Sequence, residues 1–288
     1  MGITKKMAIG YMLPGYVIII FIFAYPIIIL FRDAFFNRVD NILTFVGLQN
    51  FKGLLADPIF YISLRNNFIF LIIVPIIVII SLVIAVLLYE GLFGWKVYRV
   101  IIFLPYILAI PVVSIIFIYT LAGNGPINDI LINKLGIISK PILFFSSTKI
   151  AIWTLIGVII WKEIGLGIVL FLARLMTVDE QLFEAAEIDG ANWFHKFIHI
   201  TIPQLKTIIE FYTLFTIITV FCWVFNYVFS STNGGPGNST YILELYIYKI
   251  AFRYNIPNVA SCAAILLLVF VSFIIFIQFR VQRRFGVD

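Results

Sequence analysis

The sequence predicts an all-α protein that crosses a membrane six times. Its composition is 62% hydrophobic and only 12% charged, with a mean hydropathy of +1.10, whereas soluble domains carry about 25% charged residues. Long stretches hold almost no charge, and each covers the roughly 20 residues that a helix needs to cross the hydrocarbon core. The stretches lack the alternation of barrel strands, and lipid leaves no backbone group unpaired, so helices are the predicted solution.

The predicted spans follow one another along the chain within a single transmembrane domain, residues 1–288. The first should remain as an anchor, because its apolar run exceeds the roughly 7–15 residues of a signal peptide core and Arg32-Asp33 follows without a cleavage pattern. The fourth is interrupted only by Lys162-Glu163. Prolines inside the spans predict kinks, at Pro26, Pro75, Pro105 and Pro111. The expected spans are approximately residues 8–31, 66–89, 100–122, 150–173, 208–230 and 258–279.

Basic residues at both ends of the chain predict its orientation. Lys5 and Lys6 precede the first span, and the cluster Arg280-Val281-Gln282-Arg283-Arg284 follows the last. Because Lys and Arg near span ends favour the cytoplasmic side, both termini are predicted to be cytoplasmic. The net charge of +6 fits anionic membrane lipid. It does not indicate nucleic acid, because no basic patch is interleaved with exposed aromatic residues.

The residue patterns of catalysis are missing from the sequence. There is no G-x-x-x-x-G-K-[ST] phosphate loop, so the chain is not expected to hydrolyse ATP, and no nucleophile elbow or catalytic carboxylate pair is present. His195 and His199 have i, i+4 spacing, but no Glu follows His195 and no third ligand lies nearby. We therefore predict no enzyme activity, no metal site and no cofactor in this chain.

A polar insert at residues 177–206 interrupts the apolar pattern between spans four and five. Thr177 and Glu180 have the spacing of a capping box that opens a short helix. Gly190 suits a left-handed helix end, and Asn192 can cap a second short helix that carries Trp193 and Phe197. Pro203 should then mark entry into the next span. The insert is predicted to form a helix–turn–helix elbow at the cytoplasmic membrane face.

Five residues within the spans are candidates for contact with a transported solute. Lys162 and Glu163 are ionisable groups in an apolar stretch, which marks them as functional candidates. Neighbouring helical residues point about 100° apart, so we expect no pairing between the two; a structural partner elsewhere is favoured over solute contact. Trp223, Asn226 and Tyr227 could stack on and hydrogen-bond a sugar, with anchoring at the membrane interface as the favoured alternative.

The insert resembles the signature loop of the permease subunits of binding-protein-dependent ABC importers. The matching residues are Glu184-Ala185-Ala186, Asp189-Gly190-Ala191 and Ile200-Thr201-Ile202-Pro203. Weaker similarities favour the carbohydrate-uptake branch, and within it the type of the larger maltose permease subunit and its glycerol-phosphate counterpart. They cover nearly the whole chain, at residues 46–51, Arg99, residues 103–105, Trp161-Lys162, Gly165, residues 232–236 and residues 246–252.

The resemblance implies a type I ABC importer permease fold in a prokaryotic inner membrane. The elbow would be a coupling helix that docks on a cytoplasmic ABC ATPase dimer, and ATP and Mg²⁺ would bind to that partner. A second homologous permease subunit, most simply in a heterodimer, and an extracytoplasmic sugar-binding protein would complete the importer. The docking residues implied by the motif are Glu184, Ala185, Ala186, Asp189, Gly190, Ala191, Trp193, Phe197 and Pro203.

The cargo implied by this branch is an oligosaccharide, a disaccharide, or a polyol or glycerol-phosphate compound. An ion-coupled secondary transporter is the alternative function. Such a transporter needs a coupling-ion site within the membrane and usually carries inverted repeats. Apart from Lys162-Glu163, the spans hold no candidate ion relay.

Overall fold

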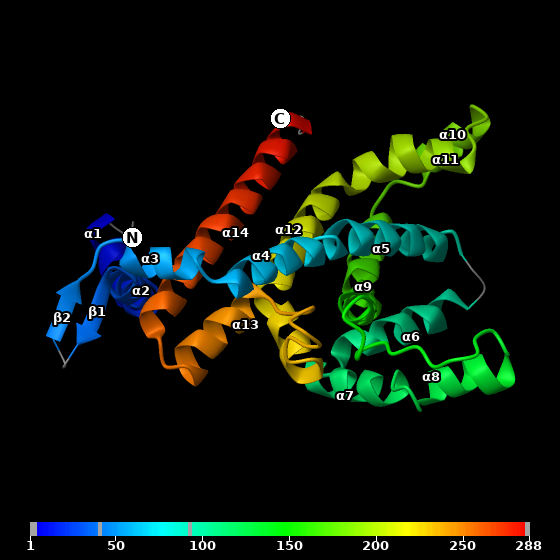
Figure 1. Cartoon of the computed structure of the whole chain (residues 1–288). Helices are drawn as coiled ribbons and strands as arrows, with labels where there is room; N and C mark the ends of the chain where they lie inside the picture. Colours follow the sequence, from blue (N-terminus) through cyan, green and yellow to red (C-terminus); the bar gives the residue numbers. More distant parts are fainter. Residues whose placement is uncertain (1–4, 40–41, 92–93, 286–288) are drawn as a thin grey trace. The chain divides into compact units, whose positions relative to one another are not determined.

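The computed structural model describes residues 5–39, 42–91 and 94–285, and nearly all of its regular structure is helical (Figure 1). Within these described residues, five helices are long and apolar enough to cross a membrane, and a bent helix pair provides a sixth crossing if the pair is counted as one span. This confirms the predicted all-α polytopic fold. The chain divides into two compact units. The single transmembrane domain stays a prediction.

The first unit combines residues 1–61 with residues 246–273. Its first span runs through α1 (Lys5–Ile19), the π-helical turn η1 (Ile20–Ala24) and α2 (Tyr25–Phe35). A short antiparallel hairpin follows, with β1 (Phe36–Val39) paired to β2 (Ile42–Phe45), and then α3 (Gln49–Leu55). Buried Asn50 donates to the Ala34 carbonyl at 3.0 Å, which ties α3 to the end of α2. The helix pair α13 (Leu243–Tyr248) and η4 (Lys249–Arg253) leads into α14 (Pro257–Phe285).

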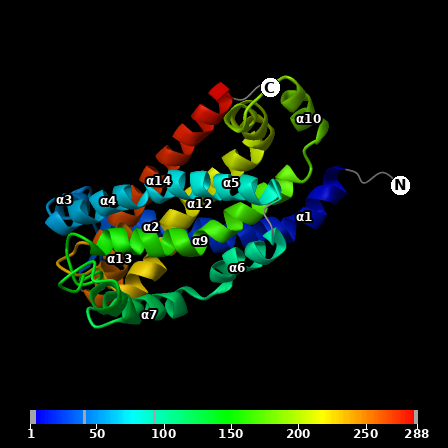
Figure 2. The same ribbon diagram turned by 90° about the vertical axis from the view of Figure 1, so that its right-hand side faces the viewer.

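The second unit, residues 62–245 and 274–288, contains most of the core. The span Pro58–Tyr89 consists of α4 (Pro58–Phe70) and α5 (Ile73–Tyr89). In Figure 2, α5 lies beside α9 (Ala151–Leu175), which also packs against α6 (Trp95–Ile107). Helix α12 (Ile202–Ser231) contacts α5, α7 (Ile110–Thr120) and α9. Apolar side chains fill these contacts, among them Ile77, Leu155, Ile168, Phe171, Leu205 and Val224.

The predicted third span is not a single straight helix. Helix α6 ends at Ile107, Leu108 and Ala109 are extended, and α7 begins at Ile110 after a turn of 99°. Pro105 and Pro111 flank the break. Because proline lacks an N–H donor and crowds the preceding turn, the predicted kink has become a full interruption. The chain continues through α8 (Pro126–Asp129) and η2 (Ile130–Lys134), where the Asn128 side chain bonds the Ala122 and Ile142 carbonyls.

Glycine permits the close approach of α9 to α6. A Cβ atom at Gly165 would lie 2.7 Å from the Ile102 carbonyl oxygen and 3.1 Å from the Phe103 Cα. These are backbone atoms, so the neighbouring helix would have to move as a whole. Gly157, on the same helix, has no atom within 4 Å of an added Cβ.

The substitution Gly165→Ala should therefore destabilise the second unit by about 1–3 kcal/mol, the usual cost of overpacking a filled interior. The measurement is the unfolding midpoint in detergent, followed by helical circular dichroism. Gly157→Ala is the matched control and should be neutral or slightly stabilising, because alanine favours helix and meets open space. Equal midpoints for the two variants would contradict the close contact.

An asparagine pair in α4 holds the loop that follows α12. Asn66 donates to the carbonyl oxygens of Asn238 and Tyr241, at 3.3 and 2.9 Å. Asn67 accepts from the Leu243 amide at 2.8 Å and donates to both carboxylate oxygens of Glu244, at 3.0 and 3.1 Å. Burial raises the pKa of Glu244 from an ordinary 4.5 to about 7, although the Asn67 hydrogen bonds act in the opposite direction.

This shift has a defined sign for stability. A carboxyl group whose pKa is higher in the folded state favours folding when it is protonated, so its contribution is lost as the pH rises from about 4.5 through about 7. As the pH rises through this window, we expect the thermal midpoint of the wild type to fall relative to that of Glu244→Gln. Above the window the difference between the two midpoints should level off. Parallel pH profiles of the two proteins, measured by calorimetry in detergent, would contradict the burial of a carboxylate here.

Candidate functional site

The polar elbow begins where α9 ends, and its start differs from the predicted capping box. Thr177 donates to the Arg174 carbonyl at 2.7 Å and so serves the end of α9. Helix α10 (Gln181–Ile188) has Glu180 at its N-cap without a side-chain bond. The side chain that accepts there belongs to Asp179, from the Gln181 amide at 3.0 Å. The capping-box prediction was wrong because the extra turn of α9 takes up the threonine hydroxyl.

The turn between the two arms of the elbow forms as the sequence predicts. Gly190 has a φ of +78°, and its neighbour Ala191 donates back to the Ala186 carbonyl at 2.9 Å. This is the closing bond of a left-handed helix end. Asn192 then accepts from the His195 amide at 2.9 Å and caps α11 (Trp193–Lys196).

The second arm is not a separate short helix. Helix α11 passes through the π-helical turn η3 (Phe197–Thr201) directly into α12, so that residues Trp193–Ser231 make one continuous helix. The Ile202 amide bonds the Phe197 carbonyl, five residues back, and Pro203 follows in the first turn of α12. A widened turn at this point accommodates a proline within a helix. Pro203 thus marks the start of α12 as predicted, but the helix continues through it without a break.

The elbow presents exposed motif residues on one side and encloses a hollow on the other. Glu184, Ala185, Asp189 and Gly190 are exposed. The hollow, about 530 Å³, is lined among others by Tyr89, Phe183, Glu187, Trp193 and Lys196. Lys196 pairs with Glu187 at 2.6 Å, and the rings of Trp193 and Phe197 stack at 5.2 Å. The Lys196–Glu187 ion pair links the two arms, and the ring contact lies within the second arm.

The sequence reasoning missed one prominent residue of the elbow. Ile188, at the end of α10, is 87% exposed. An isoleucine between the polar Glu187 and Asp189 gives little sequence signal beyond its place in the motif. Ile188 therefore adds an exposed apolar side chain to the motif residues near the turn.

The second site is built around Lys162 and Glu163 in the middle of α9. Contrary to expectation, the two side chains pair with each other, with Lys162 Nζ 3.2 Å from Glu163 Oε1. The four-carbon stem of lysine is long enough to bend the ammonium group back across the 100° between neighbouring positions. Lys162 is only 4% exposed, and its ammonium also donates to the Tyr106 carbonyl at 3.1 Å and lies 5.3 Å from the Tyr106 ring centre.

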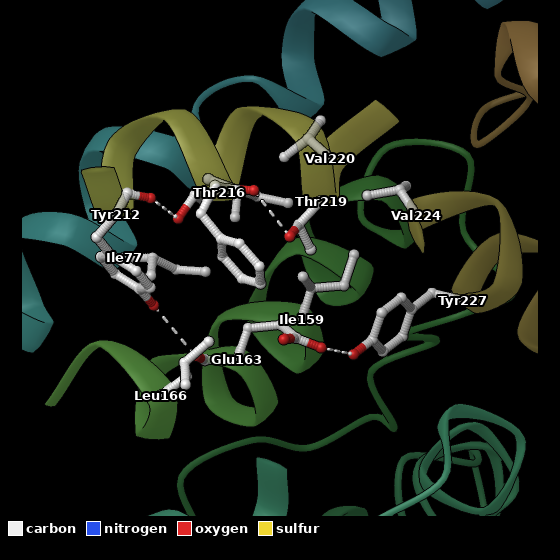
Figure 3. A pocket seen from close by; sticks show the side chains of 12 residues that line it. Ile77, Ile159, Glu163, Leu166, Tyr212, Thr216, Thr219, Val220, Val224 and Tyr227 are labelled. Carbon is white, nitrogen blue, oxygen red and sulfur yellow. Dashed lines mark hydrogen bonds between the residues drawn. The ribbon is translucent and has the colours of Figure 1, made fainter. Parts of the chain in front are cut away.

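Tyr227 of α12 completes this cluster. Its side chain is 1% exposed, and its hydroxyl donates to Glu163 Oε1 at 2.5 Å (Figure 3). A second buried tyrosine of α12, Tyr212, donates to the Glu163 backbone carbonyl at 3.3 Å. One carboxylate oxygen therefore accepts from both an ammonium and a phenol, which compensates two polar groups in apolar surroundings.

A cavity of about 840 Å³ opens beside this cluster. The turn from Ile107 to Pro111 forms one side, and Trp223 and Asn226 of α12 form another. Four of the five residues predicted from the sequence line it, namely Lys162, Glu163, Trp223 and Asn226, and Tyr227 lies next to it through Glu163. Trp223 is 52% exposed and offers a ring face. Tyr106 and Thr219 also line the cavity, and no sequence pattern had marked them.

No cluster of three metal-ligating side chains occurs within the described ranges 5–39, 42–91 and 94–285. His195 and His199 stack with their ring centres 4.3 Å apart, and His199 Nδ1 lies 3.1 Å from the His195 carbonyl. Both side chains are exposed on the elbow.

Comparison with known proteins shows the family to which this chain belongs. Residues 53–287 match the family described as binding-protein-dependent transport system inner membrane component. The lactose transport system permease LacF of Rhizobium radiobacter is 32% identical over 283 residues, which cover 94% of this chain and 92% of the relative. The arabinooligosaccharides permease AraP of Bacillus subtilis (strain 168) is 29% identical, with 91% and 84% covered. The chain belongs to this family of transport permeases.

A solved structure shares the fold. A bacterial alginate ABC transporter, crystallised with a periplasmic protein that carries an alginate pentasaccharide, matches with a TM-score of 0.85 and 22% identity. The match covers 99% of this chain and 98% of that one. The predicted permease fold is thereby confirmed, and the alternative of an ion-coupled secondary transporter is set aside by the family membership.

Proposed function

We propose that the chain is the membrane-spanning translocation subunit of an ATP-driven importer that takes up a sugar. The proposal is supported by the family, and by relatives whose names record lactose, arabinooligosaccharide and sulfoquinovosyl glycerol transport. An extracytoplasmic binding protein would deliver the sugar, as the alginate pentasaccharide-bound protein does in the similar structure. A second homologous permease subunit would face this one across the membrane path.

The cavity beside α6 and α7 is the proposed binding site for the transported sugar. It combines the face of Trp223 with the amide of Asn226 and the hydroxyl of Thr219. Aromatic faces pack against the apolar faces of sugar rings, and neutral polar groups orient the hydroxyls, as is typical of small-molecule sites. The charges of Lys162 and Glu163 compensate each other. The lining therefore suits a neutral, hydroxyl-rich solute.

The elbow is the proposed docking site for a cytoplasmic ABC ATPase dimer, which would bind ATP and Mg²⁺ while this chain remains non-catalytic. The observation that carries the proposal is the exposure of the signature residues on a rigid turn: Glu184 and Gly190 face solvent, and Ile188 protrudes beside them. Both termini and the elbow would lie in the cytoplasm of a prokaryotic cell with the chain in the inner membrane.

The substitution Gly190→Arg should uncouple ATP hydrolysis from uptake in the reconstituted importer, and Glu184→Lys should do the same. A bulky cation at the turn obstructs docking, and a reversed charge opposes it, while the membrane helices are untouched. We expect uptake per ATP hydrolysed to fall about tenfold or more, the size of a lost interface contact of about 1.4 kcal/mol. The measurement is radiolabelled sugar uptake and phosphate release in the same proteoliposomes.

Gly136→Arg provides the matched control. Gly136 also has a positive φ, +61°, and open space around an added Cβ, as Gly190 does. The two arginine variants therefore carry similar backbone strain, and only one lies on the elbow. Normal coupling in Gly190→Arg and Glu184→Lys, or ATP-independent uptake by the wild type, would refute the proposed docking.

A further inference from the structure

The break between α6 and α7 leaves backbone groups at the end of α6 without their helical hydrogen-bond partners. The last carbonyls of a helix lose their partners, and within a membrane protein other protein groups or water in a cavity must satisfy them. In an unbroken helix the Tyr106 carbonyl would accept from the amide of Ile110, but the chain turns away at Leu108 and Ala109. The Pro105 carbonyl is satisfied locally by the Leu108 amide at 3.2 Å. The Tyr106 carbonyl instead meets the ammonium group of Lys162 at 3.1 Å.

Lys162 suits this position in charge as well as in geometry. A cation at the C-terminus of a helix interacts favourably with the helix dipole, and the ammonium also lies near the face of the Tyr106 ring. A buried cation requires a counter-charge, and Glu163 supplies it at 3.2 Å. The ammonium group of Lys162 thus contacts a carbonyl oxygen, a carboxylate oxygen and an aromatic ring of the protein itself. It needs no hydrogen bond from a solute.

The counter-charge is itself anchored to a third helix. Tyr227 of α12 donates to the same carboxylate oxygen that pairs with Lys162. The chain of contacts therefore runs from the α6 carbonyl through Lys162 and Glu163 of α9 to Tyr227 of α12. Each of the three helices borders the same cavity.

We propose that Lys162 is a positioning residue that caps α6 and, through Glu163 and Tyr227, fixes the break whose turn shapes the cargo cavity. This inference rests on the proposed function of the cavity, because the helix break matters for transport only if the cargo passes there. Lys162 acts on the cargo through the backbone of residues 106–111. Loss of the ammonium group releases the turn and changes the shape of the cavity wall.

The first test measures the geometry of the break without transport. Spin labels at Tyr98→Cys and Tyr119→Cys, both exposed and one on each side of the break, report the distance between α6 and α7 in a Cys222→Ala, Cys262→Ala background. We expect one narrow distance in the otherwise unchanged protein, a broad or shifted distribution in Lys162→Met, and recovery in Lys162→Arg. A narrow, unshifted distance in Lys162→Met would overturn the positioning role.

A pair of tyrosine variants distinguishes the effect of the hydrogen bond to the Glu163 carboxylate from a general effect of packing. Tyr227→Phe removes the hydroxyl that bonds the Glu163 carboxylate, whereas Tyr212→Phe removes a hydroxyl that donates to the Glu163 backbone carbonyl. Both tyrosines are buried on α12. Tyr227→Phe should broaden the distance, and Tyr212→Phe should leave it unchanged. Equal behaviour of the two variants would contradict the relay through the carboxylate.

The second test connects the break to transport. In the complete reconstituted importer, Lys162→Met should lower sugar uptake per ATP hydrolysed about tenfold, because a small misplacement of a binding wall has large effects, while Lys162→Arg restores most of it. A broadened distance with unchanged uptake would overturn the link to the cargo path. If the wild-type importer carries no sugar, the proposed function fails, and the distance measurement still decides the role of Lys162.

Discussion

The hydrogen bond from Lys162 to the Tyr106 carbonyl, which the helix break deprives of its helical partner, is the interaction on which the proposed cargo site depends. The turn between α6 and α7 creates a hollow among helices that otherwise pack closely. Such a break is tolerated where other groups of the protein, or water in a cavity, replace the lost backbone bonds. The pair of Lys162 and Glu163, with Tyr227, provides the replacement within the core of the second unit. The buried ammonium group of Lys162 thus lies where the Tyr106 carbonyl needs a hydrogen-bond donor, and Glu163 supplies its counter-charge.

Helices α9 and α12, which carry Glu163 and Tyr227, lead into and out of the elbow. Helix α9 carries Glu163 and ends at Leu175, and residues 176–180 connect it to α10, whereas the long helix Trp193–Ser231 returns from the elbow to Tyr227. No flexible linker separates the elbow from α12, because α11 and η3 continue directly into it. One continuous helix therefore joins the second arm of the elbow to the cavity wall at Trp223 and Asn226.

The sequence predicted the helical class, the turn at Gly190 and the Asn192 cap, because each depends on local chemistry that a few neighbouring residues determine. It also selected Lys162, Glu163, Trp223 and Asn226, which line one cavity. It did not predict the pairing of Lys162 with Glu163, the 99° break or the continuity of α11 with α12. These depend on contacts between helices: the side chain of Lys162 bends back because the Tyr106 carbonyl of another helix attracts it. Tyr106 and Thr219 escaped notice because their roles arise only from packing.

Protection of the cavity by cargo tests the central claim most directly. A single cysteine at Asn226, in the Cys222→Ala, Cys262→Ala background, reacts with a maleimide in the reconstituted importer, and the rate is compared with and without saturating sugar-loaded binding protein and ATP. The cavity described here predicts that cargo slows labelling at Asn226→Cys severalfold, while a cysteine at exposed Phe252 reacts at the same rate in both states. An unchanged rate at Asn226→Cys during active uptake would place the cargo path elsewhere.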